Sequence, residues 1–395
     1  MKKAGGKRLL GVPPNIFFLG VVSFLTDVSS EMTLTILPLF LTSVLGVGPA
    51  IIGLIEGIGE STATTLRVFS GWLADRTKKR KALTVVGYTL SSLAKPFLYF
   101  ATSWGLVLGV RFTDRLGKAV RTAPRDALVA SSSAPNEMGR SFGFQRALDS
   151  YGAVVGLALA ALAVFLAQRT APDLTRASYQ KLVLIGIIPA FLAPLLLLWK
   201  VKEPPSAPPA EKPPSRQALS RRFKLFLAIM VVFTLGRFSD AFLILRAHDL
   251  GLSPFHILAV LAMFNLVYAG TSFPAGVLSD RLGRKAVILM GFAVYALIYL
   301  GFARATAPWQ VVFLFVAYGL YYGATEGVGR AYVADLVPER SRGTAYGFYH
   351  GAVGLAALPA SLLAGVLWQA IAPAAPFYLG ASLAGVAMLG LLFLR

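Results

Sequence analysis

Residues 276–289 read Gly-Val-Leu-Ser-Asp-Arg-Leu-Gly-Arg-Lys-Ala-Val-Ile-Leu and lie between two long apolar runs. A near copy, Gly-Trp-Leu-Ala-Asp-Arg-Thr-Lys-Lys-Arg-Lys-Ala-Leu, occupies residues 71–83. The aspartates of the two stretches, Asp75 and Asp280, are 205 residues apart. A polar, basic segment that recurs at about half the chain length indicates two similar halves.

Two further pairs keep this period. A Leu-Gly pair occurs at 45–46 and again at 250–251, and a Gly-Phe pair occurs at 143–144 and again at 347–348. The repeat therefore extends over most of each half. Internal duplication of this kind is a feature of transporter folds.

The second stretch follows the pattern Gly-x-Leu-(Ala/Ser)-Asp-Arg-x-Gly-Arg-(Lys/Arg) at every position. This pattern resembles the loop between the second and third helices of major facilitator superfamily transporters. The first stretch departs from it, with Lys78 opposite Gly283 and Lys79 opposite Arg284. The resemblance implies an all-α integral membrane protein that is not an enzyme, with twelve transmembrane helices in two pseudo-symmetric six-helix bundles.

The composition is that of a membrane protein. Of 395 residues, 56% are hydrophobic and 14% are charged, and the mean hydropathy is +0.67. A soluble protein of this size could not bury so much apolar surface. The net charge of +20 would indicate nucleic-acid binding in a soluble chain. Here the basic residues cluster between apolar runs, as in cytoplasmic loops, so no nucleic acid partner is expected.

The sequence contains no sign of a cofactor. The chain has no cysteine, which excludes disulfides and thiolate metal sites. It also has no nucleotide-binding P-loop, so ATP is not expected to drive the protein directly. We therefore expect neither a cofactor nor a metal.

The apolar runs predict twelve helices, because a bilayer span needs about 20 apolar residues. We expect an N-terminal six-helix bundle at 1–200, a proline-rich cytoplasmic linker at 201–221 and a C-terminal six-helix bundle at 222–395. The basic and apolar start imitates a signal peptide but has no cleavage site, so it is expected to stay as the first helix. The expected helices span 14–45, 49–72, 81–102, 105–130, 140–168, 179–200, 222–247, 254–278, 285–303, 308–335, 342–370 and 375–394.

The distribution of Lys and Arg predicts the orientation. Basic residues concentrate before helix 1, between helices 2 and 3, in the linker, and between helices 8 and 9. In a twelve-helix count these segments all fall on one side, which is the cytoplasmic side of membrane proteins. We expect a multi-pass monomer in the inner (plasma) membrane, in contact with lipid and with both termini in the cytoplasm.

Ionisable residues at membrane depth mark an aqueous cavity or a paired network, because a charge in hydrocarbon is costly. Helices 6, 9 and 12 have no interior charge and are expected to face lipid, whereas the charge-rich helices are expected to line a central cavity. Many of these charges share one helix face through spacings of three, four or seven residues. The candidate substrate-binding and coupling residues are Asp27, Glu31, Glu56, Glu60, Arg111, Asp114, Arg115, Lys118, Arg146, Asp149, Arg237, Asp240 and Glu326.

The charges of helices 1, 2, 4 and 5 sum to zero, which favours pairing between helices over an anion site on the basic stripe of helix 4. After Arg111, helix 4 has Asp114 and Arg115 where the commoner superfamily pattern has Gln and Gly. Helix 5 lacks the Gly-Pro pair typical of drug–proton antiporters. The residues at 114–126 are similar to those of a poorly characterised prokaryotic subgroup, and this similarity supplies no substrate.

We expect a secondary transporter that moves a small solute by alternating access, with protons as the coupling ion and export as the preferred direction. Carboxylates on helices 1, 2 and 5 are the candidates for proton coupling, because burial and the arrival of water or a cation change the affinity of a carboxylate for a proton. Two alternatives stay open. One is anion uptake through the stripe of helix 4, and the other is a membrane receptor or assembly factor that does not transport.

By resemblance to the superfamily, the repeated loop is expected to act as a gate. A helix N-terminus attracts a carboxylate, so Asp75 is expected near the start of helix 11 at 341–344, and Asp280 near the start of helix 5 at 139–141. Each aspartate is also expected to meet an arginine at the cytoplasmic end of helix 4 or helix 10. The gating candidates are Gly71, Asp75, Arg76, Arg121, Arg125, Gly276, Asp280, Arg281, Gly283, Arg284 and Arg330.

Overall fold

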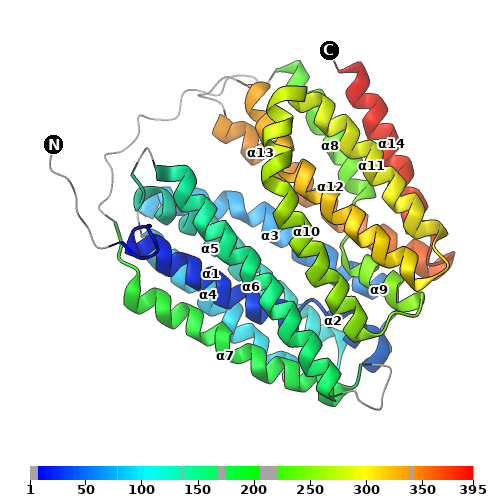
Figure 1. Ribbon diagram of the computed structural model, residues 1–395, viewed down its shortest axis with the longest axis horizontal. Helices are drawn as coiled ribbons and strands as arrows, with labels where there is room; N and C mark the ends of the chain where they lie inside the picture. Colours follow the sequence, from blue (N-terminus) through cyan, green and yellow to red (C-terminus); the bar gives the residue numbers. More distant parts are fainter. Residues whose placement is uncertain are drawn as a thin grey trace. The chain divides into compact units, whose positions relative to one another are not determined.

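The computed structural model describes residues 8–77, 79–134, 137–167, 174–204, 220–337 and 342–394 (Figure 1). Over these residues every regular element is helical. The first half contains α1 (Pro14–Thr33), α2 (Leu37–Leu39), a π-helical turn (Phe40–Val44), α3 (Pro49–Thr77), α4 (Arg80–Ala94), a 3-10 helix (Lys95–Phe100), α5 (Trp104–Ser131), α6 (Met138–Ala167) and α7 (Arg176–Lys200). The second half contains α8 (Arg221–Gly236), α9 (Ala241–Asp249), α10 (Pro254–Leu282), α11 (Arg284–Arg304), α12 (Pro308–Asp335), α13 (Arg342–Ala370) and α14 (Ala375–Phe393).

In the described residues these elements form twelve spans, as predicted. Eight of them are long and apolar enough to cross a membrane by length and composition alone. The helices α3 and α5 are not among the eight, and both carry several of the charged residues expected to line an aqueous cavity. Side-chain caps define some of the helix starts: Thr175 accepts a hydrogen bond from the N–H of Ser178 at 3.2 Å, and Ser220 accepts one from Phe223 at 3.1 Å.

The first predicted helix, 14–45, is interrupted in the structure. The helix α1 ends at Thr33, and helical structure resumes as α2 and the π-helical turn. Pro38 explains the interruption, because proline has no N–H to bond the carbonyl four residues earlier and its ring crowds that carbonyl. The prediction of one continuous helix was wrong because the apolar run itself continues through the break.

The first helix of the second half, predicted at 222–247, is also two helices. The helix α8 ends at Gly236 and α9 begins at Ala241. Between them the N–H of Ser239 donates to the Oγ of Ser361 at 3.2 Å, and the Oγ of Ser239 accepts from the N–H of Ala241 at 3.3 Å. These contacts satisfy backbone groups that the missing helical turn leaves unpaired, as a non-helical segment at membrane depth requires.

The repeated Leu-Gly pair ends the interrupted helix in both halves. Gly46 has a φ of 64° and Gly251 has a φ of 93°. Glycine adopts this left-handed conformation without a Cβ clash, and such a residue commonly terminates a helix. The sequence repeat therefore reflects a shared turn.

The helices that follow the two repeated loops begin 204 residues apart, α4 at Arg80 and α11 at Arg284. Lys79 therefore stands opposite Gly283 as the residue before the helix, one position away from the alignment predicted above. Gly283 has a φ of 84°, whereas Lys79 has a φ of −98°. Lysine is strained at positive φ, so the first loop enters its helix by a different path.

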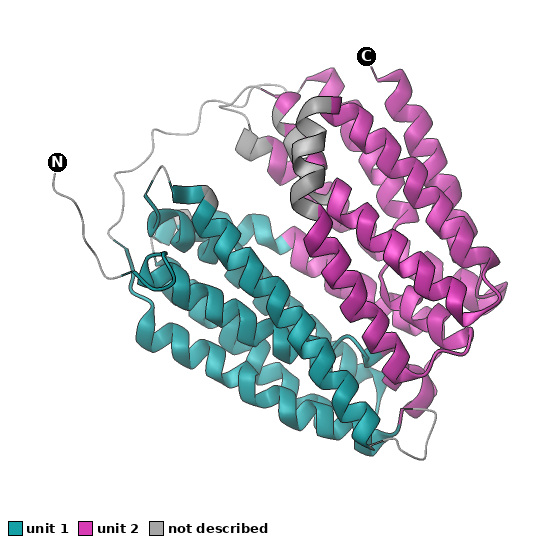
Figure 2. Cartoon of the chain, viewed as in Figure 1, with its two compact units in different colours: residues 1–37, 66–169, 175–208 teal, residues 38–65, 170–174, 209–395 magenta. Residues whose placement is uncertain are grey.

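The chain forms two compact units (Figure 2). Unit 1 comprises residues 1–37, 66–169 and 175–208, and unit 2 comprises residues 38–65, 170–174 and 209–395. The helix α3 thus contributes its first part to unit 2 and its last part to unit 1. The bundle boundaries at residues 200 and 222 remain predictions.

Close helix contacts hold unit 1 together. A Cβ on Gly152 of α6 would lie 2.5 Å from the carbonyl oxygen of Phe24, and one on Gly156 would lie 2.7 Å from that of Val28, both on α1. Small residues permit such close approach in membranes. A buried apolar cluster that unites α1, α4, α5 and α7 consists of Val12, Ile16, Leu19, Val22, Tyr88, Leu128, Val129, Ala193, Leu197 and Val201.

Aromatic side chains form much of the core of unit 2. Phe233 of α8 stacks on Phe292 of α11 with ring centroids 4.3 Å apart, and Tyr295 stacks on Tyr299 at 4.0 Å. The first part of α3 packs closely against α13. A Cβ on Gly53 would lie 2.2 Å from a backbone carbonyl oxygen of α13, so only glycine fits this contact.

Candidate functional site

Two predicted carboxylates come together in unit 1. Asp27 on α1 and Asp149 on α6 lie within hydrogen-bonding reach of each other, and both side chains are partly exposed. Two carboxylates have no hydrogen to donate and repel each other, so this contact is favourable only when the pair holds a proton. The pair is therefore a place where unit 1 can bind one proton between two side chains.

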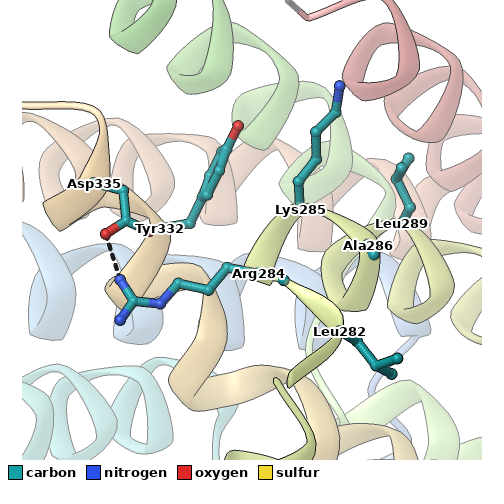
Figure 3. Close-up of a pocket in the computed structure, with 8 residues that line it drawn as sticks. Leu282, Arg284, Lys285, Ala286, Leu289, Tyr332 and Asp335 are labelled. Atoms are coloured by element: carbon teal, nitrogen blue, oxygen red, sulfur yellow. Dashed lines mark hydrogen bonds and ion pairs between the residues drawn. The ribbon is translucent and has the colours of Figure 1, made fainter. Parts of the chain in front are cut away.

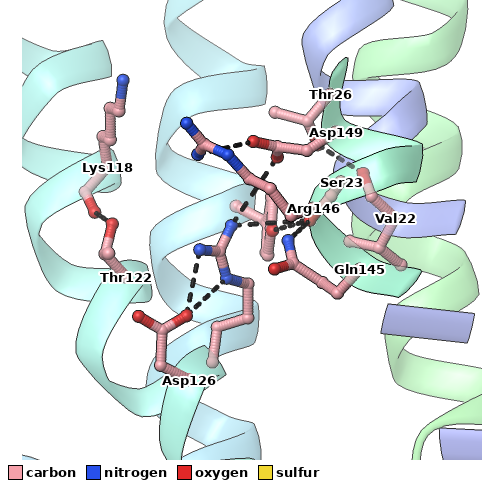
Figure 4. A network of polar contacts seen from close by, with 11 residues as sticks. Val22, Ser23, Thr26, Lys118, Thr122, Asp126, Gln145, Arg146 and Asp149 are labelled. Atoms are coloured by element: carbon pink, nitrogen blue, oxygen red, sulfur yellow. Dashed lines mark hydrogen bonds and ion pairs between the residues drawn. The ribbon is translucent and has the colours of Figure 1, made fainter. Parts of the chain in front are cut away.

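Two arginines lie beside Asp149, and Figure 4 labels one of them, Arg146. Arg146, one turn earlier on α6, is 3.3 Å from Asp149, and Arg125 of α5 is 4.0 Å from it. Arg125 also forms a 3.0 Å ion pair with Asp126. Arg125, which was predicted as a gating residue, thus lies in the same network as the predicted coupling residues of α6.

Glu31 lies one turn after the first carboxylate of α1, and it accepts a hydrogen bond from the hydroxyl of Thr35. Lys118, Arg115 and Arg111 of α5 interact with it electrostatically. The basic stripe of α5 therefore lies opposite the acidic face of α1 within unit 1. Opposite charges placed in this way compensate each other at membrane depth.

Three charged residues of α5 are buried: Arg111, Asp114 and Arg121 are 6%, 5% and 7% exposed. Arg121 donates a 2.6 Å hydrogen bond to the Oγ of Ser91, and its guanidinium carbon lies 4.6 Å from the centre of the Tyr88 ring. A hydrogen bond and a cation–π contact thus hold this arginine against α4. Such contacts make burial of a charge tolerable.

In unit 2, the predicted residues Arg237 and Asp240 lie at the break between α8 and α9. Arg237 donates to the hydroxyl of Tyr322, and its guanidinium carbon lies 4.8 Å from the centre of that ring. The hydroxyl of Tyr318 donates to Asp240 at 2.9 Å. Two tyrosines of α12 thus bind both charges at the break.

The predicted carboxylates of α3 lie near this group. Glu56 is buried, and it accepts a 3.3 Å hydrogen bond from the Oγ of Ser239. Glu56 and Glu60 both interact electrostatically with Asp240. Unit 2 therefore holds three predicted carboxylates and one predicted arginine beside a set of tyrosines.

The second repeated loop borders a pocket at the start of α11 (Figure 3). Arg284 forms a 2.5 Å ion pair with Asp335 at the end of α12. The pocket has a volume of about 570 Å³, and it is lined by Leu282, Gly283, Arg284, Lys285, Ala286, Leu289, Tyr332 and Asp335.

Around the first repeated loop, the contacts of Arg76 and Gly71 are not close ones. The guanidinium of Arg76 lies 5.3 Å from the ring centre of Trp72, and a Cβ on Gly71 would lie 3.5 Å from the Cβ of Ala123, an ordinary contact distance. The predicted gate contacts remain predictions, because several side chains lie outside the part of the chain that the structure describes. These side chains are those of Asp75, Asp280, Arg281, Glu326 and Arg330, and the surroundings of Gly276 also lie outside that part.

The structure adds residues that the sequence pattern did not select. Gln145 donates a 2.9 Å hydrogen bond to the Oγ of Ser23 and joins α6 to α1 beside Asp149. Lys95 is a buried lysine that contacts α1. A lone charge in an otherwise apolar helix was the one signal for Lys95, and nothing in the sequence marked Gln145. Among the described residues, no group of three or more His, Cys, Asp or Glu side chains could hold a metal ion.

Comparison with known proteins identifies the family. The family model of the Major Facilitator Superfamily matches residues 19–245 and 225–395. An uncharacterized MFS-type transporter of Methanocaldococcus jannaschii is 40% identical over 389 residues, which cover 96% of this chain and 94% of that protein. A class E tetracycline resistance protein of Escherichia coli is 31% identical over 138 residues, which cover 35% of this chain and 33% of that protein.

The fold agrees with this relationship. A crystal structure of a variant of the nucleoside transporter NupG superposes with a TM-score of 0.79 and 15% identity, and the match covers 96% of this chain and 99% of that one. The repeated loop, the twelve spans and the full-length family match therefore lead to one conclusion. This chain belongs to the Major Facilitator Superfamily, and it is an integral multi-pass membrane transporter.

Proposed function

We propose that this transporter moves a small organic solute by alternating access, coupled to protons, with export as the preferred direction and both termini in the cytoplasm. The contact between Asp27 and Asp149 is the observation that supports proton coupling. Export rests on how common that role is in the superfamily and on the partial similarity to a tetracycline resistance protein.

The carboxylate pair offers a simple coupling chemistry. With one proton bound, one carboxyl donates to the other and the pair carries a single negative charge, which the nearby arginines balance. When the proton leaves, the two carboxylates repel each other, and Asp149 is drawn toward Arg146 and Arg125 at 3.3 and 4.0 Å. Proton release can therefore move α6 relative to α1 within unit 1. A transport cycle needs such a link between proton binding and helix position.

The basic stripe of α5 does not favour anion uptake as a separate function. Glu31 lies within electrostatic reach of Lys118, Arg115 and Arg111, so the stripe already has an acidic partner in unit 1. Anions remain in the compound screen described below, and stabilisation by anions alone would support uptake instead.

The test begins with the substrate. A compound library is screened for thermal stabilisation of the purified protein, because a ligand that binds the folded state raises its apparent stability. The stabilising compound is then used in proteoliposomes under an imposed pH gradient, with a pH-sensitive dye inside the vesicles. We expect substrate-dependent proton movement in the wild type.

Variants assign the coupling residues. Asp27→Asn and Asp149→Asn are each expected to retain substrate binding but to lose transport driven by the pH gradient. Asp249→Asn is the matched control, since Arg246 and Asp249 form an i, i+3 ion pair at 2.6 Å just as Arg146 and Asp149 do at 3.3 Å. Full pH-driven transport in both aspartate variants would exclude the pair as the proton site.

A further inference from the structure

Lys95 is a charged residue placed deep in unit 1. It lies where α4 changes into the 3-10 helix Lys95–Phe100, and its side chain is 1% exposed. Counted from the start of α4, it lies about 22 Å along the helix axis. That depth is within a hydrocarbon core of about 30 Å. An ionisable group at such a place is a candidate for function.

The amine of Lys95 is held by two neutral groups. Its Nζ donates to the Oγ of Ser29 at 2.8 Å and to the Oγ of Ser30 at 2.9 Å, both on α1. No carboxylate oxygen lies within 4.0 Å of this nitrogen among the residues that the structure describes. The charged groups that face it at longer range are Asp27 and Glu31 on α1 and Asp114 and Arg121 on α5.

These contacts suit both protonation states of an amine. An ammonium group has three N–H donors, and a neutral amine keeps two donors and gains an acceptor. Two donated hydrogen bonds can therefore persist when the proton leaves. Arg246 of unit 2 illustrates the contrasting case, because this buried arginine donates to two backbone carbonyls and to Asp249 and never loses its proton.

The two serines connect this amine to the interruption of helix 1. The carbonyl of Ser30 accepts the N–H of Leu34 at 2.8 Å, and the carbonyl of Ser29 accepts the hydroxyl of Thr33 at 2.8 Å. These are the last bonds of α1 before the break. A change at the Lys95 amine thus acts directly on the turn that ends α1.

We propose that Lys95 binds and releases a proton in the transport cycle, and that Ser29 and Ser30 pass its protonation state to the break after α1. In the release step one N–H bond of the ammonium group breaks, the proton passes to a water molecule, and a neutral amine and a hydronium ion result. The proposal rests on the proposed proton coupling, to which it adds a second proton site.

The test uses pH-dependent distances in the full-length protein in lipid vesicles. The chain has no cysteine, so Thr77→Cys and Ala286→Cys add two unique spin-label sites next to the repeated loops, on residues whose side chains are exposed. Distance distributions are recorded from about pH 6 to pH 10, the range in which perturbed lysines titrate. In the wild type, one linked proton changes the ratio of two populations by up to about tenfold per pH unit.

Three variants separate a proton site from a packing role. Lys95→Arg keeps a permanent charge, so its distribution is expected to stay at the wild-type low-pH position at every pH. Lys95→Met and Lys95→Gln carry no charge, so their distance distributions are expected to stay at the wild-type high-pH position. The glutamine variant serves if the methionine variant does not fold, because glutamine can still donate hydrogen bonds to the serines. Lys181→Met, a change at an exposed lysine of α7, is the control and is expected to titrate as the wild type does.

The outcomes distinguish this proposal from the function on which it rests. If Lys95→Arg keeps the wild-type pH response while Asp27→Asn loses it, proton coupling stands and the role of Lys95 is overturned. If the wild type shows no pH response at all, proton coupling itself fails, and this proposal fails with it. The proposal is supported if the distance distributions of the arginine variant and of the neutral variants shift in opposite directions, because loss of a purely structural lysine would not cause opposite shifts.

Discussion

The crossing of α4 and α5 provides a sharp test of packing in unit 1. A Cβ on Gly117 of α5 would lie 2.5 Å from the Oγ of Ser91, 2.6 Å from the carbonyl oxygen of Gly87 and 2.9 Å from the N–H nitrogen of Ser91. Two of these atoms belong to the backbone of α4 and cannot rotate away. Gly109, two turns earlier on the same helix, has no atom within 4 Å of such a Cβ.

The two glycines therefore predict opposite effects of one methyl group. Alanine stabilises a helix interior by about 1 kcal/mol relative to glycine, and this gain applies at both positions. Overpacking costs about 1–3 kcal/mol, and it applies only to Gly117→Ala. We expect Gly109→Ala to be slightly more stable than the wild type, and Gly117→Ala to be about 1–3 kcal/mol less stable than Gly109→Ala.

The measurement is the midpoint of thermal denaturation in detergent, followed by size-exclusion chromatography. At about 2–4 °C per kcal/mol, the two variants should differ by roughly 2–12 °C. Gly117→Ala should also disturb the 2.6 Å hydrogen bond from Arg121 to Ser91, because the new methyl group displaces that serine. Equal midpoints for the two variants, or a higher one for Gly117→Ala, would refute the close crossing.

Three further predictions concern the charges at the loops and in unit 2. Asp75→Asn should weaken the expected bond to a helix N-terminus and so shift the ratio of the two conformational states about tenfold. Spin-label distances between the repeated loops should then lengthen, and unchanged distances would contradict the gate. Asp240→Asn and Tyr318→Phe each weaken or remove the 2.9 Å contact between these side chains, so both should reduce ligand-induced stabilisation more than the stability of the ligand-free protein. Arg284→Ala should change the free energy of unfolding by less than about 1 kcal/mol, because the two side chains of its 2.5 Å ion pair are exposed, Arg284 at 34% and Asp335 at 48%. A larger loss would show that the pair stabilises the fold.

Several features of this protein follow from local sequence alone. The repeated loops, the apolar runs and the spacing of charges predicted twelve spans and a two-fold repeat, because each signal is carried by residues close together in the chain. The paired carboxylates of α1 are an example, since a spacing of four places Asp27 and Glu31 on one face without any knowledge of neighbouring helices. The repeated Leu-Gly pair was recognised from the sequence only as part of the repeat, and the structure shows that Gly46 and Gly251 both adopt the positive φ that glycine tolerates.

The partners of these residues were decided by tertiary structure. Asp27 meets Asp149, which lies 122 positions later, and Lys95 meets Ser29 and Ser30 of an earlier helix. Hydropathy cannot show such contacts, because they depend on how each helix rotates and how closely its neighbours approach, and glycines such as Gly117 set that approach. The break after α1 was missed for a different reason: its side chains are as apolar as those of a helix, so the hydropathy run hid the local effect of Pro38 on the helical hydrogen bonds.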